Sequence, residues 1–150
     1  MELEHADWPR FTRPGFRLEF CYPAVTPQGH AVERTEEQAV DHCGDIERVH
    51  LTSRDCRELY VEVVRFRDLA TQDEYLQHRQ YLDQRFGAGS VSGLTETSLR
   101  EWPAWAYAFR WDEGERSVLS FQVARDTYRI IYDPRSGLNT QVLATLTIAE

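Results

Sequence analysis

The chain has 150 residues and a formal net charge of −8 at pH 7. Hydrophobic residues make up 41% of the sequence and charged residues 28%, a balance that is typical of a globular protein and excludes a disordered one. A chain of this length predicts a single domain spanning residues 1–150. Its negative charge repels nucleic-acid phosphates and anionic lipid heads, so we expect no nucleic-acid binding.

The basic residues are informative because all 17 are arginine and none is lysine. This excludes chemistry that depends on lysine, such as a Schiff base or the phosphate-loop lysine. The N-terminus has no apolar segment resembling a signal peptide, and no run of apolar residues is long enough to span a bilayer. We therefore expect a cytoplasmic protein without membrane insertion.

The first predicted elements are strands. Residues 1–14 are polar and interrupted by prolines, so they predict an irregular N-terminal arm. From Phe16 to Tyr22 apolar and polar residues alternate, which indicates a strand with one buried face, and Pro23 ends it. After a turn at residues 27–29, the polar stretch from His30 to Glu37 predicts a weaker strand near the edge of a sheet.

A hairpin and a helix follow. The stretches 46–52 and 58–66 predict paired strands, and the second is apolar on both sides, which favours a place inside the sheet. Thr71 and Glu74 have the spacing of a capping box, in which both side chains satisfy free backbone amides of the first helical turn. The predicted helix continues to Gly87 with an apolar stripe formed by Tyr75, Leu76, Leu82 and Phe86.

The last third of the chain predicts a meander and a closing helix. Strands are expected over 94–99, 103–112, 116–124 and 127–132, and the breaks between them are short enough to make neighbouring strands antiparallel. Ser136 is placed to cap a helix whose Leu138, Val142 and Leu146 lie four residues apart. The element order predicts an α+β fold with a mostly antiparallel sheet and a helix on each face.

The strand at 103–112 carries the candidate binding residues. Trp105, Tyr107, Phe109 and Trp111 share one face, and three alanines on the other face would let a helix approach closely. Two interpretations stay open: the aromatic side chains belong to the core, or with Trp102 they line a groove for an apolar ligand or a partner's segment.

Catalytic and metal sites are not indicated. Serine is not midway between Gly89 and Gly93, as a nucleophile elbow would require. His42, Cys43, His50 and Cys56 lack the spacing of zinc sites, and extended chain would place His42 about 25 Å from His50. The three cysteines show no C-x-x-C pair, and Cys21 is expected to be a small packed residue. We expect no metal, no cofactor and no enzymatic activity.

The order of the elements resembles the PsbP-like superfamily, which includes the extrinsic P subunit of photosystem II, a Ran-GTPase-binding nuclear import factor and many bacterial proteins. The similar pieces are the strand Gly15–Pro23 with its Tyr-Pro ending, the helix over 73–86, the strand that begins Pro103-Ala104, and residues 128–146. The glycine that family members often place before the Pro-Ala step is replaced here by Glu101-Trp102. The resemblance implies an α-β-α sandwich used mainly for non-catalytic binding to other proteins.

Three classes of function remain open at this point. The first is a protein-interaction module with an unidentified protein partner, acting as a monomer or homodimer. The second is a carrier of a small apolar ligand in the aromatic groove, and the third is a small hydrolase-type enzyme. An exposed apolar patch would favour the first, a pocket of about 300–1,000 Å³ the second, and titratable groups with shifted pKa values in a cleft the third.

Overall fold

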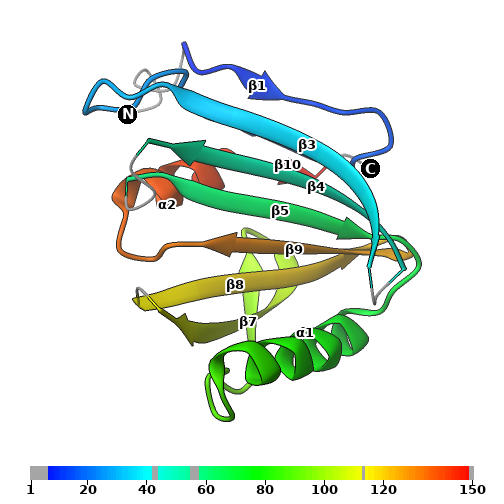
Figure 1. Ribbon diagram of the computed structural model, residues 1–150. Coiled ribbons are helices and arrows are strands. Elements are labelled where there is room, and N and C mark those ends of the chain that lie inside the picture. Colours follow the sequence, from blue (N-terminus) through cyan, green and yellow to red (C-terminus); the bar gives the residue numbers. More distant parts are fainter. Residues whose placement is uncertain (1–6, 42–43, 55–57, 113, 149–150) are drawn as a thin grey trace.

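The computed structural model describes residues 7–41, 44–54, 58–112 and 114–148 and shows an antiparallel α+β fold (Figure 1). Seven strands form the main sheet in the order β3-β4-β5-β9-β8-β7-β6, and three short strands form a second sheet in the order β1-β2-β10. The strands are β1 (Arg10–Phe11), β2 (Leu18–Cys21), β3 (Val32–Asp41), β4 (Gly44–Ser53), β5 (Tyr60–Phe66), β6 (Thr95–Leu99), β7 (Trp102–Trp111), β8 (Gly114–Val123), β9 (Asp126–Tyr132) and β10 (Thr147–Ile148). The helices are α1 (Thr71–Phe86) and α2 (Gly137–Ala144).

The predicted strand pairings of the main sheet are confirmed. Strands β6, β7, β8 and β9 are successive antiparallel neighbours, as the short breaks between them predicted, and β4 pairs with β5 as a hairpin. Strand β3 lies at the edge of the sheet, and β5 lies inside it between β4 and β9. Both faces of β5 also carry apolar residues that pack in the core, with Val61 and Val63 on one face and Val64 and Phe66 on the other.

The N-terminal arm differs from the prediction. Strand β1 lies within it, and Phe11 is fully buried and stacks on Phe20 with ring centroids 4.9 Å apart. The strand predicted from Phe16 is β2, and it joins the small sheet instead of the main one. An apolar residue within a polar, proline-containing stretch gives no periodicity, so the sequence pattern did not reveal this pairing.

One face of the main sheet packs in the larger part of the core. Residues that point to this face from β4, β5, β8 and β9 contact the small sheet and helix α2. Leu138, Val142 and Leu146, the predicted stripe of the closing segment, are buried there. The helix itself ends at Ala144, and Leu146 follows it immediately before β10.

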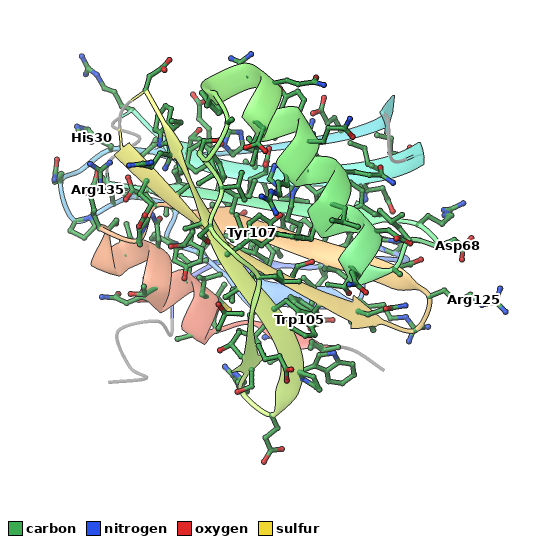
Figure 2. All side chains as sticks on the ribbon, turned by 90° about the horizontal axis from the view of Figure 1, so that it is seen from below. His30, Asp68, Trp105, Tyr107, Arg125 and Arg135 are labelled. Atoms are coloured by element: carbon green, nitrogen blue, oxygen red, sulfur yellow. The ribbon has the colours of Figure 1, made fainter. Side chains whose placement is uncertain are left out.

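Helix α1 packs against the other face of the sheet, over β7, β8 and β9. Its buried side chains Tyr75 and Leu82 meet Tyr107 and Phe109 of β7, so the helix contacts the aromatic face of that strand (Figure 2). The prediction that a helix packs against the alanine face of this strand is therefore wrong for α1. Ala104 instead packs in the larger cluster with the small sheet and α2.

The predicted capping box is also wrong. Ala70 is the N-cap residue, and no side chain caps the first turn of α1. Thr71 contacts the Thr127 hydroxyl at 3.4 Å, and the Glu74 side chain points into the core. Leu76, which was assigned to the apolar stripe, is 54% exposed. The stripe that contacts the sheet instead contains Glu74 and His78, as the next section describes.

No helix in the described part of the chain is both long enough and apolar enough to cross a membrane.

Candidate functional site: an arginine-lined pocket between helix α1 and the sheet

A buried polar network lies between α1 and the sheet. Glu74 is completely buried on α1, and Arg129 of β9 donates a hydrogen bond from Nη1 to its Oε2 at 2.9 Å. Ser120 of β8 donates to the other carboxylate oxygen at 3.1 Å. The Tyr107 hydroxyl lies 3.4 Å from both oxygens and shares a 2.7 Å hydrogen bond with Nδ1 of His78. The buried carboxylate of α1 is therefore surrounded by polar partners from three strands, β7, β8 and β9.

The network holds its charges in fixed states. Burial acts to lower the pKa of Arg129, but Glu74, Tyr107 and Glu62 together outweigh burial and raise that pKa. Burial and the Glu74 carboxylate raise the pKa of Tyr107 well above its ordinary value. At neutral pH the Arg129 guanidinium therefore stays charged and the Tyr107 phenol stays neutral.

A pocket of about 610 Å³ lies next to this network, and we call it the arginine pocket. Its volume falls in the range of pockets that hold small molecules. Four arginines line it, contributed by β4, α1, β8 and β9: Arg48, Arg85, Arg116 and Arg129. Glu62 is the one Asp or Glu among its lining residues, so arginine predominates in the pocket although the whole chain is negative. Carboxylates form ion pairs with three of these arginines: Glu37 and Glu62 with Arg48, Asp133 with Arg116, and Glu74 with Arg129.

The walls of the arginine pocket are apolar and aromatic. They are formed by Leu82 and Phe86 of α1, Phe109 of β7 and Ile131 of β9, with Tyr60, Tyr81 and Trp111. The Arg116 guanidinium lies between two of these rings, with its central carbon 3.7 Å from the centroid of Tyr60 and 4.4 Å from that of Trp111. Such stacking fixes the orientation of a guanidinium group.

Two buried donors of the pocket have neither a hydrogen-bond partner nor an ion-pair partner at the same atom among the described residues. They are Nε of Arg129, a residue only 7% exposed, and the indole Nε1 of Trp111. Nε of Arg48 lies 3.1 Å from a Glu62 oxygen, but the direction of its N–H bond misses that oxygen, so this ion pair is not a hydrogen bond. Buried donors in native structures are nearly always satisfied, so these two identify where an acceptor would bind.

The predicted binding residues divide among three places. Phe109 and Trp111 line the arginine pocket, and Tyr107 lies in the polar network beside it. Trp102 and Trp105 line a different cavity of about 700 Å³ near the start of α1. Figure 2 shows Tyr107 and Trp105 at separate positions along β7. The shared aromatic face therefore serves two cavities and part of the core.

The sequence analysis missed Glu74, His78, Arg116 and Arg129. The sequence does contain a signal for Glu74 and His78. Both lie on one helix face, at helical spacing from Thr71, Tyr75 and Leu82. Glu74 was instead assigned to a capping box, and His78 was given no role. The two arginines lie on strand faces next to apolar residues, where no local pattern distinguishes a buried arginine from an exposed one.

The candidate metal ligands lie partly outside the described residues. His42, Cys43 and Cys56 lie outside the described residues. Within the ranges that are described, no group of three or more potential metal ligands comes together. His50 packs edge-on against Tyr60 with ring centroids 4.7 Å apart, and burial lowers the pKa of its imidazole.

The comparisons with known proteins assign no family. No protein-family model matches the sequence, and no curated protein matches it significantly.

Proposed function

We propose that this chain is a non-catalytic binding domain, and that its arginine pocket binds the anionic group of a ligand that also has an apolar part. The observation that carries the proposal is the buried Nε of Arg129, which has no hydrogen-bond partner among the described residues and lines the pocket. A carboxylate or phosphate oxygen is the acceptor that a guanidinium group prefers.

The composition of the pocket supports a ligand with two chemical parts. A purely apolar molecule would leave the buried Nε of Arg129 without a hydrogen-bond acceptor, which is costly. A small inorganic anion would leave the walls formed by Phe86, Phe109 and Ile131 without contacts. A molecule with an apolar body and an acidic group satisfies both, so this proposal modifies the apolar-carrier alternative.

Binding is favoured over catalysis by the state of the titratable groups. Glu62 forms an ion pair with Arg48, and His78 shares a hydrogen bond with Tyr107. Glu74 carries several hydrogen bonds and is not among the residues that line the pocket. A general base needs a free lone pair directed at the substrate, and these groups are already engaged by the protein.

The remaining expectations from the sequence enter this proposal unchanged. We propose a PsbP-like α-β-α sandwich, a cytoplasmic location, no nucleic-acid partner, and a monomer or homodimer that needs no metal or cofactor. The acidic ligand can be free or can belong to a protein partner. A pocket that binds acidic groups is therefore compatible both with a protein-interaction module and with a carrier of a small ligand.

The test is isothermal titration calorimetry with phenylpropionate and with its neutral amide, phenylpropionamide, as a matched probe. The acid should bind and the amide should bind much more weakly. Trp111→Phe, which removes the unpartnered indole donor, should weaken binding of the acid, whereas Trp105→Phe on the same strand should not. Equal binding of acid and amide, or no binding of either, would contradict the proposal. Chemical conversion of the probe during incubation would contradict its non-catalytic part.

A further inference from the structure

A second cavity lies next to the arginine pocket, at the end of α1. It has a volume of about 380 Å³ and shares Arg85, Phe86 and Trp111 with the arginine pocket. Because the two cavities have these residues in common, they are adjacent, and we call them together the groove. The groove runs from β4 and β5 across the sheet to the end of α1 and the end of β7.

The outer part of the groove carries exposed positive charge. Arg85 and Arg110 line the second cavity and are exposed, and neither guanidinium is within 4 Å of a carboxylate belonging to the described residues. Asp112 is the one Asp or Glu that lines this second cavity. The residues that line the groove thus include five arginines and two carboxylates. Arg48, Arg116 and Arg129 are ion-paired with carboxylates, so the charge available to a partner is that of Arg85 and Arg110.

We infer that the groove binds an acidic segment of a partner protein, with one apolar side chain of the segment in the arginine pocket and acidic side chains over Arg85 and Arg110. This rests on the proposed function, which concerns the arginine pocket alone. A small acid held by Arg129 would not need the exposed arginines. An extended peptide advances about 3.3 Å per residue, so residues next to the anchored one reach the outer cavity.

The charge distribution gives a physical reason for this occupant. Exposed arginines at the mouth of a groove attract an acidic segment and increase its rate of association. The surface outside the groove is negative overall and repels other parts of an acidic partner. The groove is therefore selective for a segment that is locally acidic and contains an apolar residue.

The experiment uses fluorescence anisotropy with a labelled peptide in which one phenylalanine is flanked on each side by two glutamates. Two control peptides replace the glutamates by glutamines or the phenylalanine by alanine. The acidic phenylalanine peptide should bind most tightly. Losing one charge-assisted hydrogen bond weakens binding by about tenfold or more, so the protein variant Arg85→Gln/Arg110→Gln should bind it at least that much more weakly.

The matched protein control is Arg79→Gln/Arg125→Gln, which removes the same charge outside the groove. Both of these arginines are exposed, and Figure 2 shows Arg125 projecting away from α1. This variant should bind the peptide as the parent does. All four substituted residues are exposed, so thermal unfolding of both variants should match the parent and confirm that they fold.

Several results would overturn the inference. Binding of phenylpropionate together with equal affinities for the glutamate and glutamine peptides would leave the proposed function standing and refute the acidic segment. Equal affinities for the phenylalanine and alanine peptides would refute the apolar anchor. Displacement of the peptide by an equally charged oligothymidylate at equal concentration would identify a general polyanion site instead. If neither phenylpropionate nor any peptide binds, the proposed function fails as well.

Discussion

Glu74 and Arg129 form an ion pair whose two partners are both removed from water. Glu74 is completely buried, and Arg129 is 7% exposed. Burying an ion pair has a large desolvation cost, so such a pair adds little net stability, but removing one partner leaves an uncompensated buried charge. The pair therefore fixes the geometry beside the arginine pocket more than it stabilises the fold.

This argument predicts a non-additive double-mutant cycle. Arg129→Met should lower the free energy of unfolding by about 3–5 kcal/mol, and so should Glu74→Leu. The double variant should be clearly more stable than the sum of the two losses implies, because no buried charge is left unpaired. Urea unfolding of the four proteins measures the coupling, and additive losses would contradict it.

Tyr107 and Phe109 are the candidate residues for which the sequence was most informative. The alternating pattern predicted that both share a face, and the structure places both in the cluster under α1 at 4% and 8% exposure. The pattern could not reveal that the Tyr107 hydroxyl joins a buried polar network, because its partners come from elements distant in the sequence. The periodicity of a sequence predicts which residues share a face of a strand. It does not predict polar contacts between elements, because these depend on the tertiary fold.

Removing either ring should destabilise the protein strongly. Tyr107→Ala and Phe109→Ala should each lower the free energy of unfolding by about 3–5 kcal/mol, the cost of deleting a buried large aromatic side chain. Trp111→Ala should cost less because Trp111 is only partly buried. Thermal and urea unfolding of the three variants decides this. Near-parent stability of both Tyr107→Ala and Phe109→Ala would show that these residues serve binding and not the core.

Helix α1 shows how a local sequence signal is overridden by tertiary packing. Thr71 and Glu74 have capping-box spacing, yet the helix begins one residue earlier than that pattern requires, with Ala70 as the N-cap. Glu74 is drawn into the core by Arg129 and Ser120 and cannot turn back to its own helix terminus. A charge-assisted hydrogen bond in the core is stronger than an exposed cap, which explains the outcome.

The uncapped terminus of α1 predicts a stabilising substitution. Ala70 is exposed and has the extended backbone of an N-cap residue, with φ −77° and ψ 147°. Ala70→Ser should supply the missing acceptor and raise the free energy of unfolding by about 1 kcal/mol. Thr71→Ser, which keeps a hydroxyl one position too late for capping, serves as the control and should bring no such gain. A melting temperature of Ala70→Ser equal to that of the parent would contradict this account of the helix start.

At the scale of the whole molecule, composition gave the sign of the net charge but not where the charges lie. The negative charge argued against nucleic-acid binding, and the short breaks predicted the hairpin β4-β5 and the meander β6 to β9, but no pattern predicted that β5 pairs with β9. The groove was not predictable, because its arginines come from β4, α1, β7, β8 and β9. The sheet and helix bring these residues together, and only the packed chain shows an arginine-lined groove in a negative protein.

The most direct test of the central claim follows the indole N–H signals of the four tryptophans in a nitrogen-15 correlation spectrum. Trp111→Phe identifies the Trp111 signal, and Trp102, whose Nε1 donates to the Gln122 carbonyl at 3.0 Å, provides an internal reference. Phenylpropionate should shift the Trp111 signal progressively and leave that of Trp102 in place, and phenylpropionamide should have a much smaller effect. An unmoved Trp111 signal, or equal shifts with acid and amide, would show that the arginine pocket does not bind an anionic ligand.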